Sequence, residues 1–271
     1  MSVARARGTV AADDPHADGA PEAVSYGMAA MGAFSVPGPR PAAARPAVPA
    51  SRPLASRAAI AGMDATLDPS GALYWDDQAT LIVADLHLET GSSYARKGQL
   101  LPPHDSAITL ARLAEVVAHY RPARLIALGD SFHDPFGPER LGAPERALLT
   151  DLCAGHDVVW ITGNHDGDCS RVLGGTAADD VTLAGVTFRH IPGERLPDTP
   201  EVAGHLHPAA RVELRGRSVK RRAFVGCARR LILPAFGALT GGIDVLGREF
   251  AHLWSHAPQV HMIGKRRVYS L

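Results

Sequence analysis

The sequence is poor in cysteine, in net charge and in long apolar runs, and each shortage excludes a class of protein. Its three cysteines, Cys153, Cys169 and Cys227, are odd in number and lack the spacing of a metal finger or redox motif. This argues against a disulfide framework. We expect all three cysteines to be small, buried or half-buried hydrophobic residues of a protein in a reducing cytoplasm.

Basic residues (28 Lys and Arg) balance acidic residues (28 Asp and Glu), so the formal net charge is zero. No global positive field attracts nucleic acid, which weakens the case for a polyanionic substrate without excluding it. The mildly apolar stretch Met28–Phe34 is too short and too rich in glycine to span a membrane. Acidic residues such as Asp13 and Asp14 argue against a transit peptide. We therefore expect a cytoplasmic protein without a membrane segment.

The first 57 residues are dominated by Ala, Pro, Gly and Arg and have no sustained helical or alternating pattern. Such a segment cannot bury enough apolar surface to offset the entropy lost on ordering. We expect residues 1–57 to be a disordered tail, or coding sequence upstream of the true start. Residues 58–271 are then the folded domain.

Strand and helix patterns alternate through the first half of this domain. They predict a hairpin over 59–75 with its turn at 68–71, a polar loop at 89–103, and helices at 106–120 and 144–153. Asp105 or Ser106 is the expected cap of the first helix. The alternation predicts a largely parallel sheet. From Asp179 onward, short strands separated by Gly and Pro predict a second, mostly antiparallel sheet, so the fold class is α/β with two packed sheets.

Five of the apolar runs deliver polar residues where a strand ends, the place where α/β proteins locate their sites. The segments are Asp85-Leu86-His87, Gly129-Asp130, Gly163-Asn164-His165-Asp166, His190 and Gly204-His205-Leu206-His207. They offer seven possible ligands, and the sequence therefore predicts a metal site.

Two of these segments place their polar residues two apart. In an extended chain, Asp85 and His87 point to one side of the sheet, and so do His205 and His207. Carboxylate, imidazole and amide groups suit Mn, Fe or Zn, and a carboxylate can bridge two ions. Two ions roughly 3.5–4 Å apart clamp a phosphoryl oxygen and generate hydroxide near neutral pH. The pattern therefore predicts a centre that hydrolyses phosphoesters.

Taken alone, the shorter motifs have structural explanations. Asp-x-His is in most proteins a solvated strand end, and a lone histidine such as His190 is more often a core or surface residue. The Gly163–Asp166 segment is more specific, because a turn needs Gly and Asn but has no need of His. His133 and Asp134 lie close enough to Asp130 in the chain to support it.

The order of the five segments is similar to that of the calcineurin-like metallophosphoesterases. The resemblance implies a sandwich of two sheets flanked by helices. It also implies two metal ions: one is held by Asp85, His87 and His207, the other by Asn164, His190 and His205, and Asp130 bridges them.

The same resemblance assigns the residues that carry out the reaction. It implies that His165 contacts the phosphate and protonates the departing alcohol, and that Asp166 holds the imidazole of His165.

A closer resemblance covers most of residues 59–250. It is carried by Ala84–Glu89 with Gly91-Ser92-Ser93, Gln99–Pro103, Gly129–Asp134, Gly204–Pro208, and Leu233–Gly237 with Gly241-Gly242. These segments resemble the ligase-associated DNA damage response phosphoesterase family. The resemblance implies an Mn²⁺-dependent nuclease or phosphodiesterase that acts on DNA in repair, together with a DNA ligase and a helicase. Residues 1–57 have no place in it.

A basic cluster follows the last ligands and includes Arg217, Lys220, Arg221 and Arg222. The charges either deter edge-to-edge pairing of strands or form a track for the phosphate backbone.

Three functions are therefore carried forward: a nuclease, a phosphatase or phosphodiesterase acting on a small nucleotide or phosphomonoester, and a non-enzymatic scaffold. The full ligand set and His165 argue against the scaffold.

Overall fold

The computed structural model describes residues 34–35, 54–102, 104–165 and 173–271. All of them belong to one unit, Ala33–Leu271. Most of the expected tail lies outside the described residues, and the strand β2 begins at Ser56, close to the expected start of the domain. Among the described residues, no helix is long and apolar enough to cross a membrane.

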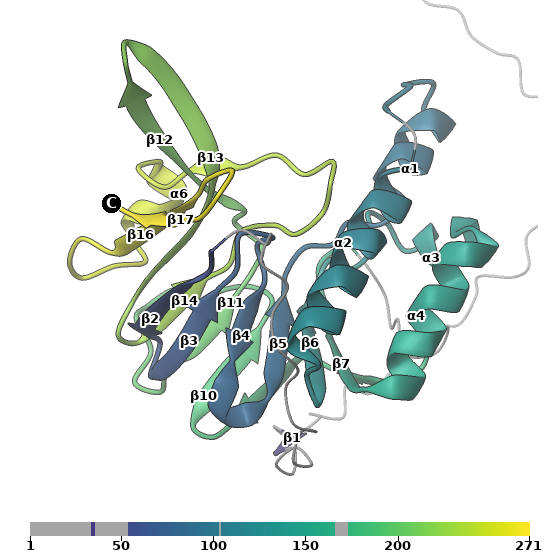
Figure 1. Ribbon diagram of the computed structural model, residues 1–271, viewed down its shortest axis with the longest axis horizontal. Coiled ribbons are helices and arrows are strands. Elements are labelled where there is room, and N and C mark those ends of the chain that lie inside the picture. Colours follow the sequence, from purple (N-terminus) through teal and green to yellow (C-terminus); the bar gives the residue numbers. More distant parts are fainter. Residues whose placement is uncertain (1–33, 36–53, 103, 166–172) are drawn as a thin grey trace, which may run out of the picture. The chain divides into compact units, whose positions relative to one another are not determined.

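The first sheet has seven strands, which lie in chain order (Figure 1). They are β2 (Ser56–Ile60), β3 (Met63–Leu67), β4 (Leu73–Trp75), β5 (Thr80–Val83), β6 (Arg124–Leu128), β7 (Asp157–Ile161) and β8 (Thr176–Ala178). The pairs from β5 to β8 are parallel, with Ile82 opposite Ile126 and Ile126 opposite Val159. The pairs from β2 to β5 are antiparallel. The sheet is therefore mixed, and its parallel part contains the strands that lead to the predicted site.

The start of this sheet differs from the predicted single hairpin. Ala61 and Gly62 have φ angles of 49° and 73°, and they turn the chain between Ile60 and Met63, which are paired. Positive φ at both central residues is the geometry of the tight turn that matches the twist of two antiparallel strands. The expected strand from Ala59 to Leu67 is thus two strands, and two hairpins stand in place of one.

The second sheet has ten strands and is also mixed. They are β1 (Phe34–Ser35), β9 (Asp180–Leu183), β10 (Val186–Arg189), β11 (Glu201–Ala203), β12 (Pro208–Leu214), β13 (Arg217–Cys227), β14 (Arg230–Ile232), β15 (Ile243–Asp244), β16 (Gln259–Ile263) and β17 (Val268–Ser270). Strand β11 is parallel to both β10 and β14, so the sheet is less purely antiparallel than predicted. The β12–β13 hairpin extends beyond the strands around it (Figure 1).

The described helices are α1 (Thr90–Arg96), α2 (Asp105–Tyr120), α3 (Gly137–Arg140), α4 (Ala143–Gly155) and α6 (Arg248–Ala251), with a 3-10 helix at Asp76–Gln78. Helices α2 and α4 pack on the outer face of the first sheet, and α6 packs on the second. Helices α2 and α4 confirm the two predicted helices. Helix α1 occupies part of the segment predicted as a loop. The sequence does not predict this helix, because its small polar residues have no apolar periodicity.

The expected cap of α2 is wrong. His104 occupies the cap position without a side-chain hydrogen bond, and the helix already includes Asp105. The two candidate caps connect to the start of α1 instead: Asp105 accepts from the Gly91 backbone N–H at 3.3 Å, and Ser106 Oγ donates to the Glu89 carboxylate at 2.7 Å.

The central parallel strands are apolar on both faces because they lie between two cores. On β5, Ile82 packs into the core between the two sheets, whereas Leu81 and Val83 pack into the core beneath the helices. The inter-sheet core also contains Phe188 and Phe224 of the second sheet. This packing fixes β5, β6 and β7 rigidly, and their carboxyl ends are held in place as a result. The two-sheet α/β sandwich flanked by helices is confirmed.

Candidate metal centre

Five loops at strand ends bring the predicted ligands into one place. Three loops follow neighbouring parallel strands of the first sheet, and two follow the neighbouring parallel strands β10 and β11 of the second. The loop after β5 carries Asp85 and His87, the loop after β6 Asp130, the loop after β7 Asn164, the loop after β10 His190, and the loop after β11 His205 and His207.

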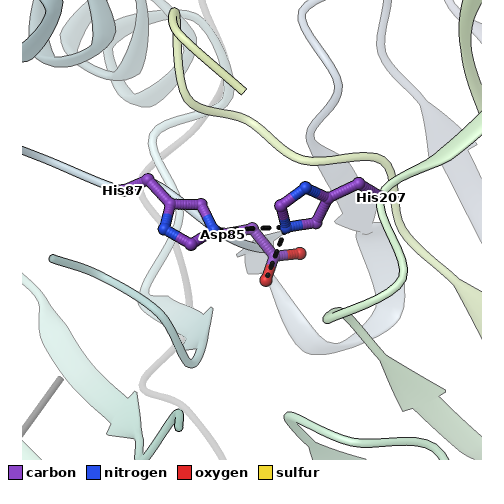
Figure 2. Close-up of side chains that lie close together, drawn as sticks. All are labelled: Asp85, His87 and His207. Atoms are coloured by element: carbon purple, nitrogen blue, oxygen red, sulfur yellow. Dashed lines mark hydrogen bonds and ion pairs between the residues drawn. The ribbon is translucent and has the colours of Figure 1, made fainter. Parts of the chain in front are cut away.

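The first group of side chains, called the Asp85 cluster, consists of Asp85, His87 and His207 (Figure 2). Its ligand atoms all lie within 4.8 Å of one another. His207 Nε2 is 3.5 Å from Asp85 Oδ1 and 3.2 Å from His87 Nε2. Two imidazole nitrogens and a carboxylate oxygen therefore face a common small volume.

The second group, called the Asp130 cluster, consists of Asp130, His190 and His205, again with ligand atoms within 4.8 Å. His190 Nε2 lies 3.3 Å from Asp130 Oδ2 and 3.2 Å from His205 Nδ1. The amide oxygen of Asn164 is 2.9 Å from the same His190 nitrogen. Asn164 thus lies beside this cluster, the one to which the family resemblance assigns it.

Asp130 also faces the other cluster. Its Oδ2 atom is 3.8 Å from His87 Nε2, while its Oδ1 atom accepts a hydrogen bond from the His165 backbone N–H at 2.9 Å. The structure therefore brings all seven predicted ligands together, with one carboxylate between the two clusters.

The backbone at this centre is unusual. Asp85, His87, Asp130, His205 and His207 all have positive φ, at 53°, 42°, 46°, 70° and 45°. Non-glycine residues in this region cost roughly 1–3 kcal/mol each and gather at functional sites. The prediction that an extended chain directs both residues of each Asp-x-His or His-x-His pair to one side is therefore wrong about the backbone. Left-handed turns after the strands aim the side chains.

Two glycines permit the close approach of the loops. A Cβ atom at Gly129 would lie 2.5 Å from the ring of His190, and one at Gly204 would lie 2.8 Å from the carboxylate of Asp85. Such contacts are too short for any larger residue without movement of a ligand. The Gly-Asp and Gly-His steps of the sequence are thus part of the centre's geometry.

The electrostatics differ between ligands of the same type. Burial lowers the pKa of His87 to about 4; the Asp85 carboxylate opposes the shift, and the neighbouring His207 adds to it. Burial also opposes protonation of His190, but its hydrogen bond to Asp130 and the charges of Asp85 and Asp130 raise its pKa. Burial acts against ionisation of Asp130, yet the hydrogen bond and charge of His190 lower its pKa to about 2.

The residues fit divalent metal ions. Two carboxylates, four imidazoles and an amide oxygen form two groups, and this donor set suits Mn, Fe or Zn. Asp85 is fully buried and Asp130 nearly so, and buried carboxylates need a cation or strong hydrogen-bond donors. We therefore identify two potential metal-binding sites that adjoin at the carboxylate of Asp130.

His165 lies beside the centre without belonging to either cluster. Its ring is 5.4 Å from that of His87, and its Nε2 atom is 4.0 Å from Asp130 Oδ2. Its Nδ1 atom is 3.1 Å from the carbonyl oxygen of His133, which can accept the ring N–H. The predicted partner, Asp166, lies outside the described residues. The His133 carbonyl is a partner that sequence reasoning missed, because backbone acceptors carry no residue-type signal.

His133 and Asp134 were expected near Asp130. The His133 ring is 5.8 Å from that of His165 and 5.9 Å from that of His87. Asp134 points elsewhere and receives both terminal nitrogens of Arg140 at 3.0 and 2.8 Å. This ion pair fixes the loop that presents His133.

The predicted nucleic-acid contacts differ in exposure, although Lys220, like Arg222, donates to a backbone carbonyl: Lys220 Nζ donates to that of Gly242 at 2.6 Å. Arg217, Lys220 and Arg221 are exposed on the β12–β13 hairpin, which begins directly after His207. Arg222 is instead half-buried and donates to the carbonyl oxygens of Ala235 at 2.7 Å and Ser70 at 3.3 Å. Its guanidinium group is committed to the protein's own backbone.

No family model and no curated protein matches the chain. Among solved structures, the chain is similar to the nuclease MPE of Pseudomonas putida, with 28% identity and a TM-score of 0.63 over 80% of this chain and 100% of that one. It is also similar to YfcE, a phosphoesterase from E. coli, with 16% identity and a TM-score of 0.39 over 71% of this chain and 97% of that one. The fold, the two ligand clusters and the similarity to the nuclease point to a hydrolase of the metallophosphoesterase type.

Proposed function

We propose that this protein is a dinuclear metal-dependent phosphodiesterase that hydrolyses DNA. The observation that carries the proposal is the pair of clusters that meet at Asp130, whose carboxylate faces His190 at 3.3 Å and His87 at 3.8 Å. With two ions bound, such a centre polarises a phosphoryl oxygen and supplies hydroxide near neutral pH.

The chain's own groups then have distinct tasks. Asp85, His87 and His207 would hold one ion, Asn164, His190 and His205 would hold the other, and Asp130 would be available to both. The His133 carbonyl can accept the Nδ1–H of His165. When the ring carries a proton on both nitrogens, Nε2 can give its proton to the departing alcohol, and Nδ1 keeps its hydrogen bond to the carbonyl. The 45% exposed side chain of His165 can reach a substrate on the open side of the centre.

Two observations support DNA over a small phosphate ester. The first is the similarity to a protein named as a nuclease. The second is the exposed basic group of Arg217, Lys220 and Arg221, which lies on the hairpin that follows His207. A local basic surface supplies the attraction for phosphates that the neutral chain as a whole does not.

Finer parts of the proposal rest on the sequence resemblance. We propose Mn²⁺ as the ion, and DNA repair alongside a DNA ligase and a helicase as the setting. Co-purification of ligase or helicase with the tagged protein from its own cells tests the setting. Absence of both from the purified material contradicts it.

The central experiment measures hydrolysis of single-stranded, double-stranded and nicked DNA beside bis-aryl and mono-aryl phosphates, with Mn²⁺, Fe²⁺, Zn²⁺ or Mg²⁺. We expect Mn²⁺-dependent cleavage of DNA and of the bis-aryl ester, and loss of both in Asp130→Asn. Turnover of the mono-aryl ester alone favours a phosphatase. Failure to turn over any of these substrates, with ions bound, favours a scaffold.

The basic group has its own test. Arg217 and Arg221 are four residues apart on β13 and share a face, so Arg217→Ala with Arg221→Ala removes two neighbouring charges. We expect weaker DNA binding and a slope of log affinity against log salt reduced by about 0.7–0.9 per lost phosphate contact. Hydrolysis of the bis-aryl ester should not change.

A matched variant keeps that result interpretable. Arg248→Ala with Arg266→Ala removes two exposed arginines outside the hairpin. An equal loss of DNA affinity in this control means that the hairpin has no special role.

A further inference from the structure

A shallow depression of about 380 Å³ opens beside the Asp130 cluster. Residues from three segments line it: the loop after β7, the start of β9 and the end of β10. They include Asn164, Asp179, Asp180, Arg189, His190 and Ile191. Ligand pockets range from about 300 to 1,000 Å³, so this depression suits one small group and not a long segment.

The depression lies directly beside the proposed catalytic centre. Asn164 and His190 line the depression and also belong to the Asp130 cluster. In a nucleotide the sugar joins the base directly to the phosphate. A phosphate bound at the metal centre therefore brings an attached base within reach of the depression.

The charges argue against a second phosphate there. Arg189 is paired with Asp180 at 3.4 Å and lies 4.0 Å from Glu201, so its positive charge is offset. Asp179, an exposed residue, adds a further negative charge to the lining. The depression is thus suited to a neutral group that carries N–H donors.

The lining also offers an apolar surface. The side chain of Ile191 is 52% exposed, although isoleucine is one of the residue types most often buried. An aromatic ring that lies on Ile191 has the Asp179 carboxylate in the same lining as an acceptor. Proteins hold a base that has left its stack by combining an apolar face with hydrogen bonds to the edge of the base.

We propose that this depression binds one nucleobase of the DNA substrate, and that Asp179 selects a base with an exocyclic amino group. This inference rests on the proposed function. A carboxylate accepts a hydrogen bond from the amino group of cytosine. Thymine has a carbonyl oxygen at the equivalent position, which repels a carboxylate. Cytosine is therefore favoured over thymine at the position next to the cleaved bond.

The test compares two single-stranded oligonucleotides of equal length, all-cytosine and all-thymine, with the metal-loaded full chain. We expect kcat/KM to be roughly fivefold higher for the cytosine strand, the low end expected for a single exposed contact. In Asp179→Ala the ratio should fall to about one, with bis-aryl phosphate turnover unchanged. Asp151→Asn, which alters an exposed aspartate on α4, should retain the ratio.

The outcomes separate the two proposals. Cleavage of both strands at equal rates by the unaltered protein, or the same ratio in Asp179→Ala, overturns the base site and leaves the nuclease intact. Failure to cleave either strand while the bis-aryl ester is hydrolysed overturns the nuclease, and the base site with it. Ile191→Ala gives a second reading: KM should rise for both strands, and an unchanged KM contradicts stacking on this residue.

Discussion

The Asp85 and Asp130 clusters use the same residue types but hold them differently. Both oxygens of Asp85 accept the His205 backbone N–H, at 3.1 and 3.0 Å, so this carboxylate is fixed from within the protein. Asp130 faces histidines of both clusters and accepts from His165. The comparison teaches that the Asp85 carboxylate is oriented by the backbone of a residue from the other cluster, whereas the Asp130 carboxylate faces the side chains of both clusters and the backbone of His165.

The sharpest test of this difference is His165→Ala, because the His165 backbone N–H that donates to Asp130 is kept and neither cluster loses a donor. We expect DNA cleavage to fall by roughly two to four orders of magnitude, as loss of a general acid does. Metal content, measured by elemental analysis, should stay the same. Unaltered turnover would remove His165 from the mechanism.

A second test separates the clusters by their carboxylates. Asp130→Asn should weaken binding at both sites, and Asp85→Asn chiefly at its own site. Each effect should exceed the roughly 10–100-fold cost of losing an outer partner of a ligand. Isothermal titration calorimetry of the metal-free protein with Mn²⁺ measures the affinity of each of the two binding steps. If Asp130→Asn impairs only one step, Asp130 does not join the clusters.

A third test uses pH. Below its pKa an imidazole holds a proton that must leave before an ion binds, so affinity falls about tenfold per pH unit in that range. The pKa of His190 is raised, whereas that of His87 is about 4. As pH falls from 7.5 to 5.5, we therefore expect the Asp130 cluster to lose its ion first. Parallel loss from both sites in a pH series of the same titration contradicts this order.

The smallest effect concerns the support of one cluster. Arg222 donates to the Ala235 carbonyl, and two residues further on, the Gly237 N–H donates to the Asp85 carbonyl at 3.0 Å. Arg222→Ala should destabilise the fold by about 1–3 kcal/mol, since it leaves buried acceptors unpaired. We expect a weaker Asp85 site, with the Asp130 site less affected.

Arg221→Ala is the matched control, because Arg221 is exposed on the same strand. Its stability in urea denaturation should stay within about 0.5 kcal/mol of the unaltered protein. Equal loss in both variants means that Arg222 has no particular supporting role.

Much of the architecture was predictable because burial leaves a pattern in the sequence. The runs before Asp85, Asp130 and Asn164 are apolar on both faces, and such strands can lie only between two cores. Their order in the chain then placed polar residues at one edge of a sheet. The two sheets and both long helices followed from these signals.

The rest depends on contacts that no local pattern reports. Helix α1 is tied down by Ser106 and Asp105, which are distant in the chain. Arg222 looks like its exposed neighbours in the sequence, and its inward direction follows only from the register of β13 with Ala209 on β12. The left-handed φ of the ligands is likewise not marked in the sequence, because Asp and His adopt it more often than most residues but still in a minority of cases.

That backbone geometry bears on protein engineering. A designer who copies Asp-Leu-His onto the end of a regular strand reproduces the letters but not the kinks, so the side chains would diverge. The turn at Asp85 and His87 is held from both sheets: its two N–H groups donate to the carbonyls of Gly129 and Asp130 at 3.3 and 2.9 Å, and the Gly237 N–H donates to the Asp85 carbonyl at 3.0 Å. The motif is therefore transferable only together with these neighbouring loops.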